Sequence, residues 1–121
     1  IGLYCRFVSG ITPERVKDGL KFEQACEWLR TTYGAMMPWS AWGSWDRDQL
    51  TTQCTRENVP YPLSPEHVDI KLFVAERLGW RRPKSLPRAL TALNMRFEGQ
   101  KHSAVDDAVN EARVLHQALL K

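Results

Sequence analysis

His102 and Asp107 have the residue types and the spacing of a general base beside a metal-binding carboxylate. Asp107 falls in the first turn of a helix expected from Ser103 to the end of the chain, and His102 falls in the loop before it. A histidine in such a loop can turn over a pocket that the first helical turn borders. The acid could then hold a cation while the imidazole takes a proton from water. The segment therefore predicts a hydrolytic site.

The same residues also allow a purely structural interpretation. Adjacent acids in a first helical turn complement the helix dipole, and a histidine near them is commonly a surface residue. Ser103 and Asp106 match the capping-box pattern, with Ser103 as the N-cap and Asp106 reaching back from the third position. We therefore assign Asp106 to the helix start and keep Asp107 as the candidate ligand. His67 is interpreted as structural and His116 as solvent-exposed.

Helix and strand signals along the chain suggest the elements that position these residues. The expected helices are 12–18, 22–33, 46–56, 72–78, 85–93 and a last one from Ser103, with an apolar face of Val105, Ala108, Val109, Ala112, Leu115 and Leu119. The expected strands are a buried one over 35–43, with Pro38 best placed at its start, and a short one over 67–70. Two strands alone make a marginal sheet, so partner strands are expected before Ile1.

Composition limits the class of protein. The 121 residues fit one domain, and 43% hydrophobic with 26% charged residues is ordinary globular composition. A net charge of +3 permits a polyanionic partner without requiring one. Cys5, Cys26 and Cys54 form no paired motif, which favours reduced thiols in a cytoplasmic protein. No apolar run is long enough to span a bilayer, so no membrane partner is expected, and the sequence leaves the oligomeric state open.

The run from Ser85 to Ala112, SLPRALTALNMRFEGQKHSAVDDAVNEA, closely resembles the final motif of the DEDDh family of 3′→5′ exonucleases. In that family the aspartate follows the histidine by five positions, which matches His102 and Asp107. This places Asp106 outside the metal site, in agreement with its assignment to the helix start.

Two further segments resemble the same family in the correct order. Gly43-Ser44-Trp45-Asp46 resembles its middle motif, in the branch that includes the histone-mRNA 3′ exonuclease, and implies that Asp46 joins the metal site. Ser9-Gly10-Ile11-Thr12 resembles the Gly-Ile-Thr segment after the third strand of the family. The resemblance spans essentially the whole chain.

The resemblance implies an α/β ribonuclease H-like exonuclease fold, here helices with a remnant sheet, as one domain over residues 1–121 that lacks its N-terminal strands. It also implies two Mg²⁺ or Mn²⁺ ions, His102 as the base that deprotonates water, and release of nucleoside 5′-monophosphates. The first motif of the family, Asp-x-Glu, is absent, so Asp46 and Asp107 are two of four expected carboxylates. We therefore expect the 121-residue chain alone to be nearly inactive and the intact protein to be an enzyme. The rival interpretation is a non-catalytic nucleic-acid- or partner-binding module on the same fold.

The expected partner is the 3′ end of a single-stranded nucleic acid, with RNA favoured by the branch resemblance. Trp45 could stack on an unpaired base, and Lys101 could contact a phosphate. Trp39 and Trp42 are interpreted as core residues. The basic loop of Arg81, Arg82 and Lys84 is interpreted as solvated surface.

Overall fold

A computed structural model describes residues 7–34 and 36–121 of the chain. The chain divides into two compact units, each taken by itself below. The central unit comprises Leu20–Pro83, and the terminal unit comprises Ile1–Gly19 together with Lys84–Lys121.

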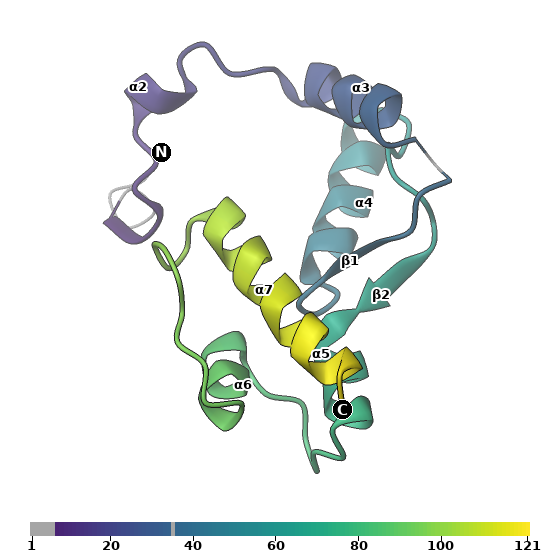
Figure 1. Cartoon of the computed structure of the whole chain (residues 1–121). Coiled ribbons are helices and arrows are strands. Elements are labelled where there is room, and N and C mark those ends of the chain that lie inside the picture. Colours follow the sequence, from purple (N-terminus) through teal and green to yellow (C-terminus); the bar gives the residue numbers. More distant parts are fainter. Residues whose placement is uncertain (1–6, 35) are drawn as a thin grey trace. The chain divides into compact units, whose positions relative to one another are not determined.

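The central unit is built on a strand–helix–strand arrangement (Figure 1). Strands β1 (Trp39–Ala41) and β2 (His67–Asp69) pair in parallel, with Trp39 opposite His67 and Ala41 opposite Asp69. Helix α4 (Trp45–Glu57) provides the crossover that parallel strands require. It ends at Asn58, whose left-handed backbone (φ 55°) closes the helix as an αL cap.

Two further helices complete the central unit. Helix α3 (Phe22–Thr32) precedes β1, and helix α5 (Ile70–Arg77) follows β2 directly. Asp69 caps α5, because its side chain accepts a hydrogen bond from the Leu72 amide. The buried apolar residues of this unit are Cys26, Ala41, Cys54, Pro62, Ile70, Val74 and Ala75.

The strand expected over 35–43 is much shorter than predicted. Ala35 lies outside the described residues, and Met36 and Met37 are exposed (92% and 55%). Pairing begins at Trp39, whose amide donates to the Glu66 carbonyl at 3.2 Å. Pro38 has no amide hydrogen to donate to a ladder, so it marks the start of the strand, as expected, and the apolar residues before it lie outside the sheet.

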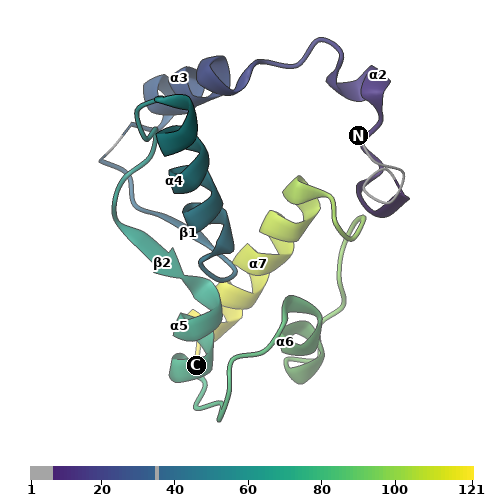
Figure 2. The same ribbon diagram turned by 180° about the vertical axis from the view of Figure 1, so that it is seen from behind.

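The terminal unit is helical in its described part. It contains α2 (Pro13–Val16), α6 (Leu86–Ala92) and α7 (Ala104–Leu119), and α6 packs against α7 (Figure 2). Thr12 caps α2 as predicted, with its hydroxyl accepting from the Arg15 amide at 3.3 Å. The buried residues of this unit are Ala89, Leu90, Asn110, Val114 and Ala118.

The apolar face predicted for the last helix is wrong. The buried residues of α7 are Asn110, Val114 and Ala118, which repeat every four positions. Val105 and Val109, by contrast, are exposed. The buried side chain of Asn110 orients the helix through hydrogen bonds that are described below. The spacing of apolar residues alone does not reveal this contact.

No helix within residues 7–34 and 36–121 combines the length and the apolar character needed to cross a bilayer.

Candidate functional site

His102 and Asp107, the predicted base and ligand, are joined at the start of α7. The His102 amide donates to Oδ1 of Asp107 at 3.3 Å. His102 is exposed and has a left-handed backbone (φ 66°), whereas Asp107 is half-buried. Left-handed geometry is uncommon for residues other than glycine, although asparagine, aspartate and histidine adopt it more often than most, and such strain tends to collect at functional sites. The structure therefore holds both predicted residues in one local arrangement.

Asp106 secures the loop before α7, but not through the predicted capping box. Its Oδ2 accepts from the Gln100 amide at 2.9 Å, while Ser103 is the N-cap without a side-chain bond of its own. The Ser103 amide already donates to the Gln100 carbonyl at 3.2 Å. The Asp106 carboxylate therefore accepts from an amide earlier in the chain, that of Gln100. At Gly99 (φ 97°) an added Cβ would lie 2.5 Å from Cγ of Asp106. Asp106 therefore has a structural role, as expected, with a different partner.

The fully buried side chain of Asn110 connects α7 to the same loop. Its Nδ2 donates to the carbonyls of Glu98 (2.8 Å) and Asp106 (2.6 Å), and its Oδ1 accepts from the Glu98 amide (3.0 Å). Arg113 Nη1 donates hydrogen bonds to Oδ1 of Asn110 (2.6 Å) and to the Arg96 carbonyl (2.8 Å). The segment that leads to His102 is thus held by side chains of α7. Sequence reasoning missed this role, although a polar residue in the middle of a mostly apolar helix was a signal.

Lys101, the predicted phosphate contact, is exposed next to His102. His116 is exposed on α7, as expected. The terminal unit thus brings together Lys101, His102 and Asp107.

Asp46 and Trp45 occupy the first turn of α4 in the central unit. Both are exposed, and 69% of the Trp45 surface is accessible. The turn before them is fixed by Asp69, whose Oδ1 accepts from the Gly43 amide at 3.0 Å as well as from Leu72. Asp69, which lies 26 positions after Gly43, therefore fixes the turn that precedes Asp46.

Trp39 and His67 pack beside this segment. Their ring centroids are 4.4 Å apart with an edge-to-face angle of 69°, and Trp39 Nε1 donates to the Ser64 carbonyl at 3.1 Å. Both ring nitrogens of His67 are buried without a hydrogen-bond partner among the described residues. Burial, reinforced by the charge of Arg47, lowers the pKa of His67. Trp39, Trp42 and His67 are all half-buried, and the interpretation of His67 as structural stays a prediction.

The chemistry of the predicted ligands suits a hard divalent cation, because carboxylate oxygens are what Mg²⁺ and Mn²⁺ prefer. Asp46 belongs to the central unit and Asp107 to the terminal unit. Within residues 7–34 and 36–121, no group of three or more His, Cys, Asp or Glu side chains forms a metal-binding cluster. Each aspartate is therefore of a kind that suits a divalent cation.

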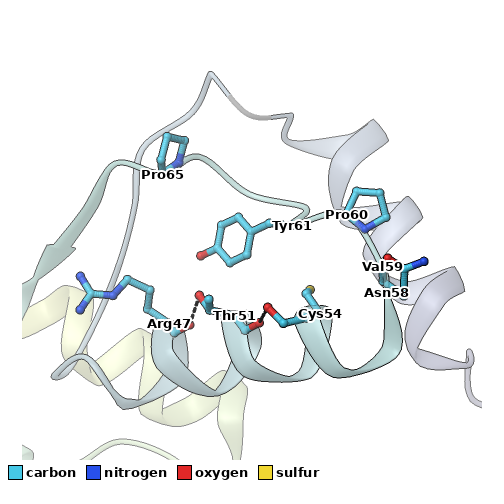
Figure 3. Close-up of a pocket in the computed structure, with 9 residues that line it drawn as sticks. Arg47, Thr51, Cys54, Asn58, Val59, Pro60, Tyr61 and Pro65 are labelled. Carbon is cyan, nitrogen blue, oxygen red and sulfur yellow. Dashed lines mark hydrogen bonds between the residues drawn. The ribbon is translucent and has the colours of Figure 1, made fainter.

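A hollow of about 600 Å³ lies along α4 in the central unit (Figure 3). Tyr61 points from the loop toward the helix, where Arg47, Thr51 and Cys54 lie. Burial raises the pKa of the Tyr61 phenol. None of the predicted site residues lines this hollow.

The comparisons with known proteins agree with the family that the motifs resemble. No protein-family model matches the chain. The ERI1 exoribonuclease 2 of Xenopus laevis is 30% identical over 115 residues, which cover 90% of this chain and 16% of that protein. The 3′-5′ exonuclease Snipper of Drosophila melanogaster is 26% identical over 131 residues, covering 91% of this chain and 46% of Snipper. The mouse ERI1 exoribonuclease 2 is also 26% identical, and 19% of its length is covered.

A solved structure shares the fold. The nuclease domain of 3′hExo, a DEDDh family member crystallised with rAMP, matches with a TM-score of 0.81 and 25% identity, over 99% of this chain and 65% of that one. The predicted α/β ribonuclease H-like fold is thereby confirmed. The chain spans less than half the length of the curated relatives that it matches.

Proposed function

Because this chain is related in sequence and fold to the DEDDh 3′→5′ exonucleases, we propose that the protein trims single-stranded nucleic acid from its 3′ end. The proposed products are nucleoside 5′-monophosphates. RNA is the favoured substrate, since two relatives are exoribonucleases by name and the matched nuclease domain was crystallised with rAMP.

The observation that carries this proposal is the conformation of His102. A left-handed backbone at a residue with a Cβ costs about 1–2 kcal/mol, and the hydrogen bond to Asp107 helps to hold it. Strain that links a base to a carboxylate five residues later is consistent with an active-site role.

Asp46 and Asp107 are proposed to bind divalent cations, Mg²⁺ or Mn²⁺, together with ligands beyond these two. Asp107 uses Oδ1 for the His102 amide, so Oδ2 is available to a cation. Bound cations would supply charge stabilisation and a more acidic water. These roles come from the family resemblance, residue by residue.

The proposed task of His102 is to accept a proton from the attacking water. The water oxygen forms a bond to the terminal phosphorus, and the bond from phosphorus to the 3′ oxygen of the preceding nucleotide breaks. That oxygen then takes up a proton, which leaves a shortened strand with a free 3′ hydroxyl. His102 suits this task because it is exposed and lies outside the helix, where its ring can reach a bound strand end.

A ladder assay tests this proposal. The intact protein, not the 121-residue chain alone, is incubated with a 5′-labelled single-stranded RNA, and with the matching DNA, in Mg²⁺, in Mn²⁺ or in EDTA. We expect stepwise shortening from the 3′ end, nucleoside 5′-monophosphate as the product, and no shortening in EDTA. Binding of the RNA without any metal-dependent shortening would instead support the non-catalytic binding module.

A further inference from the structure

The hollow along α4 lies between a face of that helix and the loop that follows it (Figure 3). Its volume of about 600 Å³ is within the range of about 300–1,000 Å³ that is typical of ligand sites. Two hydrogen bonds hold the loop in place. The Pro60 carbonyl accepts from Arg30 Nη2 at 3.0 Å, and the Ser64 carbonyl accepts from Trp39 Nε1 at 3.1 Å. A ligand would therefore enter a space whose walls are already formed.

Two hydrogen-bond donors at one end of the hollow are not used by the described part of the chain. Arg47 bonds to Asp48 through Nε and Nη2, which leaves Nη1 without an acceptor there. The Tyr61 oxygen accepts from the Trp39 indole, and its own O–H likewise has no acceptor among the described residues. Burial raises the pKa of this phenol, so the hydroxyl keeps its proton at neutral pH. Figure 3 shows the phenol oxygen on the side of the ring that faces Arg47 and Thr51.

The other end of the hollow is apolar. Val59 and Pro60 line it from the loop, and Cys54 lines it from the helix, away from the end toward which the phenol oxygen points (Figure 3). Burial, reinforced by the neighbouring Cys26, raises the pKa of the Cys54 thiol. The thiol therefore stays neutral and acts as a small apolar group. Among the described residues, Arg47 is the one charged side chain in the lining.

The two ends together select an amphiphilic acid. A carboxylate has two oxygens, which match one guanidinium N–H and one phenol O–H, and its charge strengthens both hydrogen bonds. A phosphate carries nearly two negative charges at neutral pH, which the single cation of Arg47 does not balance, and the adjacent Asp48 would repel it. A hydrocarbon chain attached to the carboxylate would bury apolar surface at the other end.

We propose that this hollow binds a small amphiphilic carboxylic acid. The carboxylate lies between Arg47 and Tyr61, and the hydrocarbon part lies at the apolar end. The site is distinct from the proposed exonuclease residues, because Asp46 precedes Arg47 on α4 but does not line the hollow. The inference therefore does not depend on the proposed function.

Isothermal titration calorimetry on the intact protein tests the class of ligand, with octanoate as the probe below the concentration at which it forms micelles. Octanoate should bind at least about tenfold more tightly than octanamide, which has a similar shape and no charge. From butyrate through hexanoate to octanoate, the affinity should rise by up to about fourfold for each CH₂ group that is buried. The proposal is overturned by absence of octanoate binding, by equal affinity for octanamide, or by affinity that does not depend on chain length.

Variants test the position of the carboxylate. Arg47→Gln should weaken octanoate binding about tenfold, whereas Arg56→Gln, an exposed arginine of α4 outside the hollow, should leave it unchanged. Tyr61→Phe keeps the ring and removes the donor, so it should weaken binding about three- to tenfold. Exposed Tyr33→Phe is its control. Wild-type affinity in folded Arg47→Gln and Tyr61→Phe proteins would show that octanoate does not bind in this hollow.

Two further probes distinguish other anions. Octyl phosphate should bind no more tightly than octanoate, because the hollow supplies one cation. Octauridylate, measured in EDTA so that it is not cleaved, should not displace octanoate. Tighter binding of octyl phosphate would contradict the selection of a carboxylate, and displacement by octauridylate would assign the hollow to nucleic acid and overturn the proposal.

Discussion

The main-chain amide of His102 donates to the carboxylate of Asp107 at 3.3 Å, so the proposed base and the proposed metal ligand share a contact. The contact lies where the backbone of His102 is left-handed. It also ties the loop conformation to the presence of the carboxylate. The predictions below separate what this region does for catalysis from what it does for stability.

Replacing His102 by glycine should raise stability and abolish activity together. Glycine adopts a left-handed backbone without strain, so the free energy of unfolding should rise by up to about 1 kcal/mol. Loss of the base should slow trimming by about 10²–10⁴-fold. Urea unfolding and the ladder assay measure the two effects. Asn94→Gly, at another left-handed position, serves as the control and should leave trimming unchanged. Full activity of the His102→Gly protein would remove the proposed base.

Substitution of Gly99 should be far more costly than substitution of Gly79. Both have a positive φ, but a Cβ at Gly99 meets the Asp106 carboxylate at 2.5 Å, and one at Gly79 has nothing within 4 Å. Gly79→Ala should cost about 1 kcal/mol, whereas Gly99→Ala should cost at least about 1 kcal/mol more. In an Asp106→Ala background most of that excess should disappear. Equal costs for the two alanine substitutions would show that Asp106 does not restrict this turn.

Loss of the Asn110 side chain should destabilise the loop that leads to His102. Asn110→Ala removes three part-buried hydrogen bonds to the main chain of Glu98 and Asp106, each worth about 0.5–1.5 kcal/mol. We expect a loss of about 2 kcal/mol in the free energy of unfolding, with reduced trimming under conditions where the protein stays folded. Gln117→Ala on the same helix should change stability by less than about 0.5 kcal/mol. A neutral Asn110→Ala would mean that these hydrogen bonds do not set the loop.

Acid should weaken the fold in part through His67. Burial lowers its pKa in the folded state, so the unfolded chain binds the proton more readily. The stability contributed by neutral His67 is present above the unfolded pKa of about 6.5 and is lost as the pH falls through the lower folded pKa. His67→Phe keeps a ring against Trp39 and removes the titration. Between pH 7.5 and 5, the variant should therefore lose less stability than the wild type in urea unfolding, whereas exposed His116→Phe should follow the wild type.

Most helices could be predicted because their signals are local. Thr12 with Pro13 marks one start, and Gly34 and Gly79 lie just beyond two ends, so short stretches of sequence contain the information. The pairing of His102 with Asp107 was predictable for the same reason. Both lie within one turn of the same helix start.

The features that could not be predicted depend on contacts between residues that are distant in the sequence. The buried face of α7 is set by the hydrogen bonds of Asn110 to a segment twelve residues earlier. The turn before Asp46 is set by a hydrogen bond from the Gly43 amide to Asp69, 26 positions further along the chain.

The most direct test of the central claim compares three carboxylates in the ladder assay. Asp46→Asn and Asp107→Asn keep size and remove charge, and Asp48→Asn does the same two positions after Asp46 in the first turn of α4. We predict that the first two slow 3′ trimming more than about a hundredfold, in line with the loss of one electrostatic contact at a reacting centre, and that Asp48→Asn retains the wild-type rate. Wild-type rates for folded Asp46→Asn and Asp107→Asn proteins would contradict the account.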